Sequence, residues 1–272
     1  MILTLVKSLS KLKDFKGTYS EKISIFFALI RLQIKGKLFK SKNKLVRESF
    51  INYKVFGYNY LNLSLLINEV FISNEYYFQP LTKDPVIIDC GANIGVSILY
   101  FKKLFPNSRI LAFEPNPHAF ELLQKNMKEN KIQNVELFNI ALLDDETEIP
   151  FYISDDISTL MGSIKRERGG IKEFKIKTQR LSYYLRNFEM VDLIKMDVEG
   201  AELNILSDLV ESFSINKTKE YIIEYHHNID QDKSALSFFL QKFEENGFNY
   251  NIQSYFRNIN TFQDILIHFY KK

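Results

Sequence analysis

The stretch from residue 85 onward alternates between short apolar strands and amphipathic helices, and this alternation restricts the fold more than any other feature of the sequence. An apolar strand at 86–88 runs into a glycine-containing turn and then into a helical stretch. A second strand follows at 109–113, after which Asn116 is the expected N-cap of a helix and Pro117 its first residue. Repeated strand–helix units of this kind build a parallel sheet with helices on both faces.

The remainder of the chain continues the pattern up to two closing strands. Further strands are expected at 135–140, 149–153, 174–178, 191–196, 221–225, 249–255 and 264–270, and further helices from Ser182, over 201–213 and from Ser234 to Gly247. The last two strands leave no room for a helix between them, so they are expected to pair antiparallel. The sequence therefore predicts an α/β fold with a doubly wound, mostly parallel, seven-stranded Rossmann-like sheet, an antiparallel last strand and an N-terminal helical extension.

Charge divides the chain into regions with different tasks. The 272 residues carry a net charge of +3, but residues 1–48 contain 12 Lys and Arg against 3 Asp and Glu, which leaves −6 on the rest. Because the basic surplus is confined to one segment, a nucleic-acid partner is not expected. We predict a basic amphipathic helical arm over 1–48, a cap or lead-in segment over 49–84 and a ligand-binding domain over 85–272.

The basic arm contains one stretch with helical periodicity. Its apolar face would consist of Ile23, Phe26, Phe27, Ile30, Ile34 and Leu38, with Lys22, Arg31, Lys35 and Lys37 off that face. Such a helix either packs on its own domain or on a second subunit, or attaches to the surface of an anionic membrane. Both interpretations stay open from the sequence.

Apolar runs and cysteine usage favour a cytoplasmic protein. The apolar start is interrupted by Lys7, and the longest apolar stretch, 23–30, is far shorter than the roughly 20 residues that span a bilayer. The single cysteine, Cys90, cannot form an internal disulfide, which suits a reducing compartment. Neither a signal peptide nor a transmembrane helix is predicted.

The turn after the first strand is the expected ligand site. Open α/β sheets bind ligands beyond the carboxyl ends of their strands, at the point where the strand order reverses. Glycines in this turn let the backbone approach a ligand closely, and Asn93 tolerates a left-handed conformation. The candidate cofactor-binding residues here are Asp89, Gly91, Ala92, Asn93 and Gly95.

Two carboxylates at the same edge of the sheet indicate the ligand. Glu114 ends the second strand, where it can accept hydrogen bonds from both hydroxyls of a ribose, and Asp89 could meet the amino group of an amino acid. The turn keeps only one glycine of the dinucleotide fingerprint, and the sequence has no P-loop. S-adenosylmethionine is therefore the predicted cofactor, with Asn139 and Ala141 expected beside its adenine ring.

Five segments resemble, in order and approximate spacing, those of the FkbM family of methyltransferases: VIIDCGANIG, FEPNP, NIAL, LIKMDVEGAE and IIEYHH. The resemblance covers about residues 50–270. It implies that 85–272 form an S-adenosylmethionine-dependent domain that O-methylates a hydroxyl of a sugar, polyketide, glycan or similar small molecule. Many members have an aspartate where this chain has Ser182, so no role of that carboxylate carries over.

A hydroxyl is a poor nucleophile until it loses its proton, so a base or a cation is expected near the methyl group. Asp197 and Glu199 follow one strand, and Glu224, His226 and His227 lie on the next. We expect His226 as general base with Asp197 near the methyl group, because histidine titrates in the useful range. Alternatively, Asp197 and Glu224 hold Mg²⁺, or these side chains only cap a helix and bond the backbone. The catalytic assignment is Asp197, Glu224 and His226, without a dedicated metal site.

Two other classes of protein stay open. A noncatalytic nucleoside-binding or scaffold module would keep the pocket without turnover, and an oxidoreductase would bind NAD. The clustered ionisable residues speak against a scaffold, which does not need them at the mouth of a pocket. Acceptor specificity is expected in the segment before residue 85 and in the loop 154–173, whose cations favour an anionic acceptor.

Overall fold

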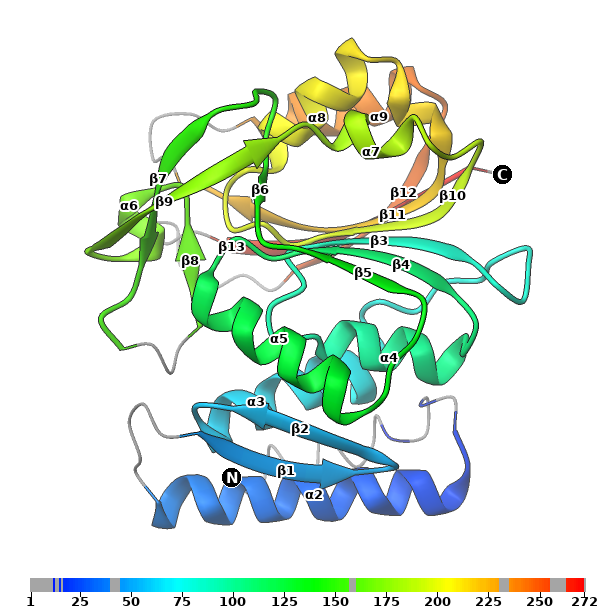
Figure 1. The fold of residues 1–272 in the computed structure, drawn as a ribbon. Helices are drawn as coiled ribbons and strands as arrows, with labels where there is room; N and C mark the ends of the chain where they lie inside the picture. The colour runs from blue at the N-terminus through cyan, green and yellow to red at the C-terminus, as the bar shows by residue number, and fades with distance from the viewer. Residues whose placement is uncertain are drawn as a thin grey trace.

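The computed structural model describes residues 12, 15, 17–39, 45–156, 160–229, 235–254 and 263–271. Its centre is a seven-stranded sheet with helices on both faces (Figure 1). In spatial order the strands are β12 (Asn249–Ser254), β13 (Gln263–Tyr270), β11 (Thr218–His227), β10 (Val191–Met196), β3 (Val86–Cys90), β4 (Arg109–Phe113) and β5 (Val135–Phe138). The predicted doubly wound α/β fold is confirmed.

The strand order reverses at β3, which lies between β10 and β4. β3 pairs parallel with both neighbours, and the register places Asp89 opposite Lys195 of β10 and Cys90 opposite Phe113 of β4. β13 pairs antiparallel with both β11 and β12, which confirms the antiparallel end of the sheet. The turns after β3, β4 and β10 therefore meet at one edge, where sheets of this kind bind ligands.

Helices cover the two faces of this sheet in separate groups (Figure 1). One face carries α4 (Val96–Leu104) and α5 (Pro117–Glu129), and the other carries α7 (Leu181–Leu185), α8 (Glu202–Glu211) and α9 (Leu236–Glu245). The predicted start of α5 is confirmed, because the Asn116 side chain accepts a hydrogen bond from the N–H of His118 at 3.0 Å and Pro117 is the first helical residue. Each face has its own apolar core, with Tyr100 fully buried in one and Phe243 in the other.

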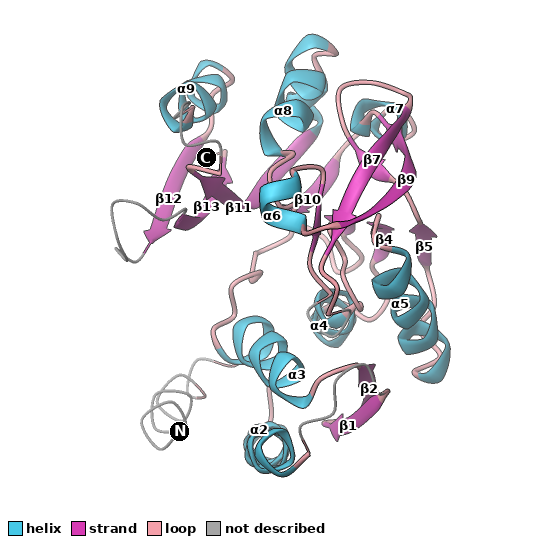
Figure 2. Ribbon diagram, turned by 90° about the vertical axis from the view of Figure 1, so that its left-hand side faces the viewer, coloured by secondary structure: helices cyan, strands magenta, loops and turns pink. Residues whose placement is uncertain are grey.

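A second, smaller sheet stands beside the carboxyl edge of the main sheet (Figure 2). Its strands, in spatial order, are β6 (Ala141–Leu142), β9 (Lys172–Gln179), β7 (Glu148–Ile153) and β8 (Gly162–Ser163), and the short helix α6 (Arg166–Gly169) packs on β7. The strands expected at 149–153 and 174–178 are therefore present. They pair antiparallel with each other, with Ile149 opposite Ile176, and form this separate sheet.

The residues before β3 form an additional layer outside α4 and α5 (Figure 1). The layer contains α2 (Tyr19–Leu38), β1 (Val46–Phe50), β2 (Tyr53–Gly57) and α3 (Tyr60–Ile67), which continues as the wider helical turn η1 (Asn68–Ile72). Thr18 and Glu21 form a capping box that fixes the start of α2. The buried carboxylate of Glu48 on β1 pairs with Arg31 and Lys35 of α2, each at 2.9 Å. Arg31 also donates a hydrogen bond to the carbonyl oxygen of Ser49 at 2.8 Å, and α2 packs on α3, so the basic arm and the lead-in segment pack together.

α2 has the apolar face that the sequence predicts, but most of that face is exposed, and the helix packs on the domain through a different one. The helix buries Ile25, Ala28, Leu29 and Leu32, whereas Ile23, Phe27, Ile34 and Leu38 of the predicted face are exposed. The stretch 23–30 is apolar on nearly every side, so two opposite faces both show the helical period. The pairs of Arg31 and Lys35 with Glu48 help to select the buried face, and such long-range contacts are not visible in local periodicity.

Candidate active site

A pocket opens at the carboxyl edge of the main sheet and encloses about 660 Å³ of space, which includes open solvent. Its lining comes from the turns after β3, β4 and β10 and from the region of the small sheet, and includes Gly91, Asn93, Glu114, Ala141, Asp197, Phe151, Leu160 and Ile164. Polar groups gather on the side of the main sheet, and apolar side chains close the opposite side. A mostly apolar pocket with a few convergent polar groups suits a small-molecule cofactor.

The turn after β3 adopts the left-handed backbone that its sequence predicts, with φ of +83° at Gly91, +49° at Asn93 and +86° at Gly95. The atoms that approach Gly91 and Gly95 most closely belong to other parts of the chain. A Cβ on Gly91 would strike the carbonyl oxygen of Asp197, and one on Gly95 would strike two side chains of α5. Gly91 also lines the cavity, where a ligand could approach it as expected. Gly95 does not line the cavity, and its lack of a side chain makes room for α5.

Glu114 stands at the end of β4 and lines the cavity. Its Oε2 accepts a hydrogen bond from the N–H of Asn93 at 2.7 Å, and its Oε1 accepts one from the N–H of Asn116 at 2.8 Å. Burial raises the pKa of Glu114 to about 7 in spite of these two bonds. Each carboxylate oxygen has a second acceptor position, so the ionised group can receive the two hydroxyls of a ribose.

Asp89 is fully buried beneath the turn, and the cavity lining does not include it. Its Oδ2 accepts a hydrogen bond from the hydroxyl of Ser97 at 2.5 Å, and its Oδ1 lies 3.2 Å from Nζ of Lys195. The cation beside Asp89 is therefore a lysine of the chain, where the sequence had suggested the amino group of a ligand.

Lys195 is a residue of the site to which the sequence assigned no role. Its side chain is 3% exposed, and Nζ donates a hydrogen bond to the carbonyl oxygen of Gly91 at 2.6 Å and lies 3.8 Å from Oδ2 of Asp197. Burial favours the neutral amine, but Asp89 and Asp197 outweigh it and raise the pKa of Lys195. One buried cation therefore joins the turn after β3 to the residue that follows β10.

The other predicted cofactor residues have different positions. Ala141 lines the cavity, as expected for a small residue beside a ring. Ala92 is buried, and its N–H donates to the carbonyl oxygen of Phe113 at 2.9 Å. Asn139 is exposed, and its amide donates to the carbonyl oxygen of Glu114 at 2.8 Å, so it supports the backbone of that residue.

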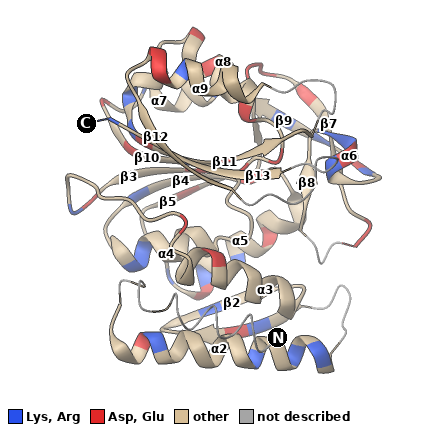
Figure 3. Cartoon of the chain, turned by 180° about the vertical axis from the view of Figure 1, so that it is seen from behind, with Lys and Arg blue, Asp and Glu red and all other residues tan. Residues whose placement is uncertain are grey.

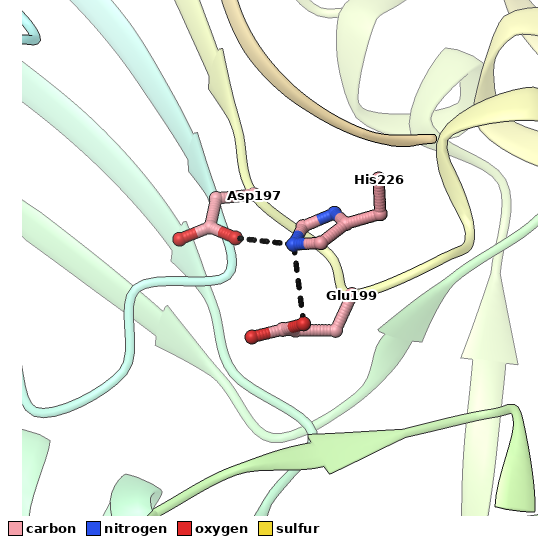
Figure 4. A group of neighbouring side chains, drawn as sticks. All are labelled: Asp197, Glu199 and His226. Carbon is pink, nitrogen blue, oxygen red and sulfur yellow. Dashed lines mark ion pairs between the residues drawn. The ribbon is translucent and has the colours of Figure 1, made fainter. Parts of the chain in front are cut away.

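The predicted catalytic residues meet where β10 and β11 end. Figure 4 shows Asp197 and Glu199 directed toward the ring of His226. Nε2 of His226 lies 3.1 Å from Glu199, 3.9 Å from Asp197 and 4.0 Å from Asp264 of β13. Nδ1 lies 2.7 Å from Oε1 of Glu202, the first residue of α8. The buried imidazole is therefore within 4.0 Å of four carboxylates.

These carboxylates determine the charge of His226. Burial opposes the charged ring, but Glu202 and Glu199 outweigh it and hold the pKa of His226 well above its usual value. An imidazolium carries a proton on both ring nitrogens and has no lone pair for another. The charge state therefore does not suit the predicted role of His226 as general base.

The charge of Asp197 also affects Glu224, the third predicted catalytic residue. The charge of Asp197, together with burial, raises the pKa of Glu224 to about 9, and burial raises the pKa of Asp197. With a pKa of about 9, Glu224 keeps its proton at neutral pH. Of these two carboxylates, Asp197 lines the cavity and is able to accept a proton.

Glu199 connects this group to the small sheet. Oε2 of Glu199 lies 2.5 Å from Nε of Arg168 on α6, and its carbonyl oxygen accepts a hydrogen bond from the hydroxyl of Ser163 on β8 at 2.5 Å. Burial opposes ionisation, but His226 and Arg168 outweigh it and lower the pKa of Glu199 to about 2. The backbone of Glu199 is left-handed, with φ of +52°, which these contacts hold in place.

Sequence reasoning missed Lys195, Glu202 and Arg168. Glu202 belongs to the segment MDVEGAE that carried the family resemblance, so that segment contained a usable signal. Lys195 lies in the longer form of that segment, LIKMDVEGAE, although its partner Asp89 is 106 positions away. Arg168 becomes recognisable only when the small sheet is known, because its partner Glu199 lies 31 positions away in the chain.

Two overlapping groups of side chains have spacings that suit a cation. They are Asp197, Glu199 and His226, and Glu224, His226 and Asp264, with the candidate ligand atoms of each group within 4.8 Å of one another. Ligands around an octahedral Mg²⁺ lie about 3 Å apart when adjacent and about 4 Å apart when opposite, given bonds of about 2.1 Å. The predicted Mg²⁺ pair, Asp197 and Glu224, is divided between the two groups, which have His226 in common.

Fold and site together define a class of protein. A Rossmann-like sheet with an antiparallel end, and a buried carboxylate at the end of the strand after the glycine turn, characterise the class I methyltransferases that use S-adenosylmethionine. Residues 89–250 match the methyltransferase FkbM domain, and the chain belongs to this family. The predicted family, the methyltransferase class and its cofactor are confirmed.

Individual relatives agree with this assignment. The chain is 32% identical over 169 residues to Methyltransferase 1 of Beauveria bassiana. The aligned region covers 55% of this chain and 68% of that protein. The chain is also 30% identical over 158 residues to 2-O-methyltransferase NoeI of Sinorhizobium fredii, covering 52% and 63%. The crystal structure of methyltransferase FkbM from Methylobacillus flagellatus superposes with a TM-score of 0.51 at 12% identity, covering 99% of this chain and 60% of that one, which shows the common fold.

Proposed function

We propose that this methyltransferase acts on a hydroxyl of a sugar, polyketide, glycan or related small molecule. The observation that carries the proposal is the position of Asp197, which lines the cofactor cavity and also lies 3.9 Å from His226. A carboxylate at this junction is placed to remove the proton of a hydroxyl at the point where the methyl group is transferred. The name of the relative NoeI, a 2-O-methyltransferase, supports an oxygen acceptor.

The residues of the cavity fit S-adenosylmethionine. Glu114 offers one acceptor position on each oxygen to the ribose hydroxyls, and Ile140, Ala141 and Leu142 supply apolar surface for an adenine ring. When bound, the cofactor supplies an electrophilic methyl group on a positively charged sulfur. The carboxylate of Asp197 at the cavity wall stabilises positive charge there and disfavours a phosphate-bearing ligand.

We assign the role of base to Asp197 and a positioning role to His226. Glu224, with a pKa of about 9, keeps its own proton at neutral pH, whereas Asp197 at the cavity wall is placed to accept the proton of the acceptor hydroxyl. The imidazolium of His226, held by Glu199 and Glu202, keeps Asp197 from rotating away from the cavity. Fixed alignment of oxygen, methyl carbon and sulfur supplies much of the acceleration in such a transfer.

A metal-assisted form of the same reaction is the second proposal. Mg²⁺ held by the carboxylates of either group, Asp197 with Glu199 or Glu224 with Asp264, would lower the pKa of the acceptor hydroxyl, and the spacing of their oxygens, within 4.8 Å, favours it. The test is the rate of methyl transfer after EDTA treatment and after Mg²⁺ is restored. A rate that EDTA leaves unchanged excludes the metal, and a rate that only Mg²⁺ restores replaces the assignment of Asp197 as base.

The test of the proposed function begins with calorimetric titration of S-adenosylmethionine and, separately, NAD. Wild type should bind only the first, and Glu114→Ala should lose this binding. Methyl transfer from labelled cofactor is then measured on sugars, glycans and polyketides with free or blocked hydroxyls. Transfer that depends on a free hydroxyl supports the proposal. Transfer to nitrogen or carbon contradicts the hydroxyl assignment, and binding without any transfer favours the noncatalytic module.

A further inference from the structure

Helix α2 has two apolar faces, of which the other described residues of the chain cover only one. Ile25 and Leu32 on the inner face are fully buried against the core. On the opposite side, Phe27 is 52% exposed, Ile34 49% and Leu38 70%. We call the exposed set the outer face of α2; it consists of Tyr19, Ile23, Phe27, Ile34 and Leu38. Isolated exposed apolar residues are ordinary, but five on one face of one helix form a continuous stripe.

The spacing of these residues makes the stripe straight. Successive members are separated by four, four, seven and four positions, which keeps them on one side of an α-helix over its 20 residues. The helix is rigidly attached, because Glu48 pairs with Arg31 and Lys35 and a capping box fixes the first turn. The outer face is therefore presented as a preformed surface.

Basic residues border the outer face, and the one acidic side chain of α2 points away from it. Lys22 flanks the stripe on one side and Arg31 on the other, while Lys37 lies near its end. The one acidic residue of α2, Glu21, is directed inward and pairs with Lys103 at 2.8 Å. Residues 1–48 as a whole have 12 Lys and Arg against 3 Asp and Glu.

No described helix or strand lies beyond α2 on this side of the molecule. Figure 1 shows α2 as the outermost element, beyond β1, β2 and α3 and on the opposite side of the molecule from α7, α8 and α9. Figure 3 shows Lys and Arg along the same helix. Within the described part of the chain, no helix has the length and apolar content needed to cross a bilayer.

We propose that the outer face of α2 binds the surface of an anionic lipid bilayer, with the helix lying in the plane of the interface. An apolar stripe bordered by lysine and arginine is the pattern that buries side chains among acyl chains and places cations at anionic headgroups. Charge complementarity selects this partner over a second copy of the chain. Two outer faces packed together would bring the exposed Lys37 of each copy against a face without a carboxylate, because the one acidic residue of α2, Glu21, pairs with Lys103.

The test is flotation of the full chain with vesicles of phosphatidylcholine alone and with vesicles that contain phosphatidylglycerol as well. The protein should float with the anionic vesicles and much less with the neutral ones, and added salt should weaken the binding. Binding is measured without a methyl acceptor, so the result is independent of the proposed function. Failure to float with anionic vesicles overturns the proposal.

Variants test whether the outer face is responsible. The double variant Phe27→Ser and Ile34→Ser should bind at least about tenfold more weakly, because two large apolar side chains no longer leave water. Lys22→Glu with Lys37→Glu should also release the protein. Leu81→Ser removes an apolar side chain that is 82% exposed elsewhere and should change nothing.

Two further measurements complete the design. Each variant should bind S-adenosylmethionine as the wild type does, since α2 is remote from the cavity, and this establishes that it is folded. Equal flotation of the Phe27 and Ile34 double variant overturns the proposal. A dimer seen by light scattering that disappears in this variant assigns the outer face to a second copy and overturns it as well.

Discussion

Nζ of Lys195 lies 3.2 Å from Oδ1 of Asp89, and the two residues are direct partners across the parallel pair of β10 and β3. Both side chains are almost completely buried, and the same amine binds the carbonyl oxygen of Gly91. A buried carboxylate without a cation is strongly unfavourable, so this contact determines whether the turn after β3 can keep its shape.

Lys195→Met should destabilise the fold and weaken cofactor binding. Loss of one partner of a buried ion pair costs about 3–5 kcal/mol, to be measured by denaturant unfolding. Lys172→Met is the matched control, because Lys172 and its partner Asp155 are both largely exposed, and the variant should cost less than about 1 kcal/mol. Equal losses in the two variants would contradict the special role of Lys195.

Binding of S-adenosylmethionine should weaken as the pH falls through about 7. Glu114 has a pKa of about 7, and only its ionised form offers both oxygens as acceptors to ribose hydroxyls. Well below pH 7 the dissociation constant should rise toward tenfold per pH unit, which calorimetry can follow. Glu114→Gln should bind weakly with little pH dependence. A wild-type affinity that is constant from pH 6 to 8 would count against the ribose contact.

Asp197→Asn should abolish most activity, whereas Glu224→Gln should be mild at neutral pH. Removal of a general base costs about 10²–10⁴-fold in kcat. Glutamine resembles the protonated form that a pKa of about 9 gives Glu224. Glu220→Gln, which alters the pair with His268 near the other end of β11, is the control. Equally severe losses at Asp197 and Glu224 would favour the metal-assisted mechanism instead.

Arg168→Ala should loosen the small sheet over the cavity. The variant removes the pair with Glu199, and amide exchange across 160–170 should become faster while the main sheet keeps its protection. Arg166→Ala, an exposed neighbour on the same helix, should leave exchange unchanged. If amide exchange across 160–170 is the same in both variants, the pair of Arg168 and Glu199 does not stabilise the small sheet.

Glu48→Gln should destabilise the N-terminal layer by about 1.5–3 kcal/mol, the usual range for hydrogen bonds to charged groups. Burial raises the pKa of Glu48, but Lys35, Ser49 and Arg31 outweigh it, so the folded value lies below the ordinary 4.5. Its contribution is therefore complete above pH 4.5 and is lost as the pH falls toward the folded value. Glu136→Gln breaks an exposed pair with Arg109 and should show neither effect.

Local patterns predicted the parts of the fold that depend on neighbouring residues. The strand before Gly91, the capped start of α5 and the antiparallel pair at the end of the chain follow from periodicity, cap chemistry and loop length. The same patterns placed Glu114 and Asp197 at the cavity, because both follow directly from strands whose ends share an edge.

Contacts between distant segments could not be predicted. The buried face of α2 depends on Glu48, the pairing of β7 with β9 depends on a separate sheet, and the charge of His226 depends on carboxylates from three further elements. Each of these features is set by partners that tertiary structure brings together, so no window of neighbouring residues contains it.

Gly91 lies so close to the carbonyl oxygen of Asp197 that no side chain fits between them, and Lys195 binds to both turns. Natural variation is therefore expected to leave this pair of turns nearly invariant among relatives that retain turnover. Changes of acceptor should accumulate in the segment before β3 and in those residues of the small sheet that do not line the cavity, because these can be exchanged without disturbing the cofactor. Engineering of new acceptors has its best starting points there.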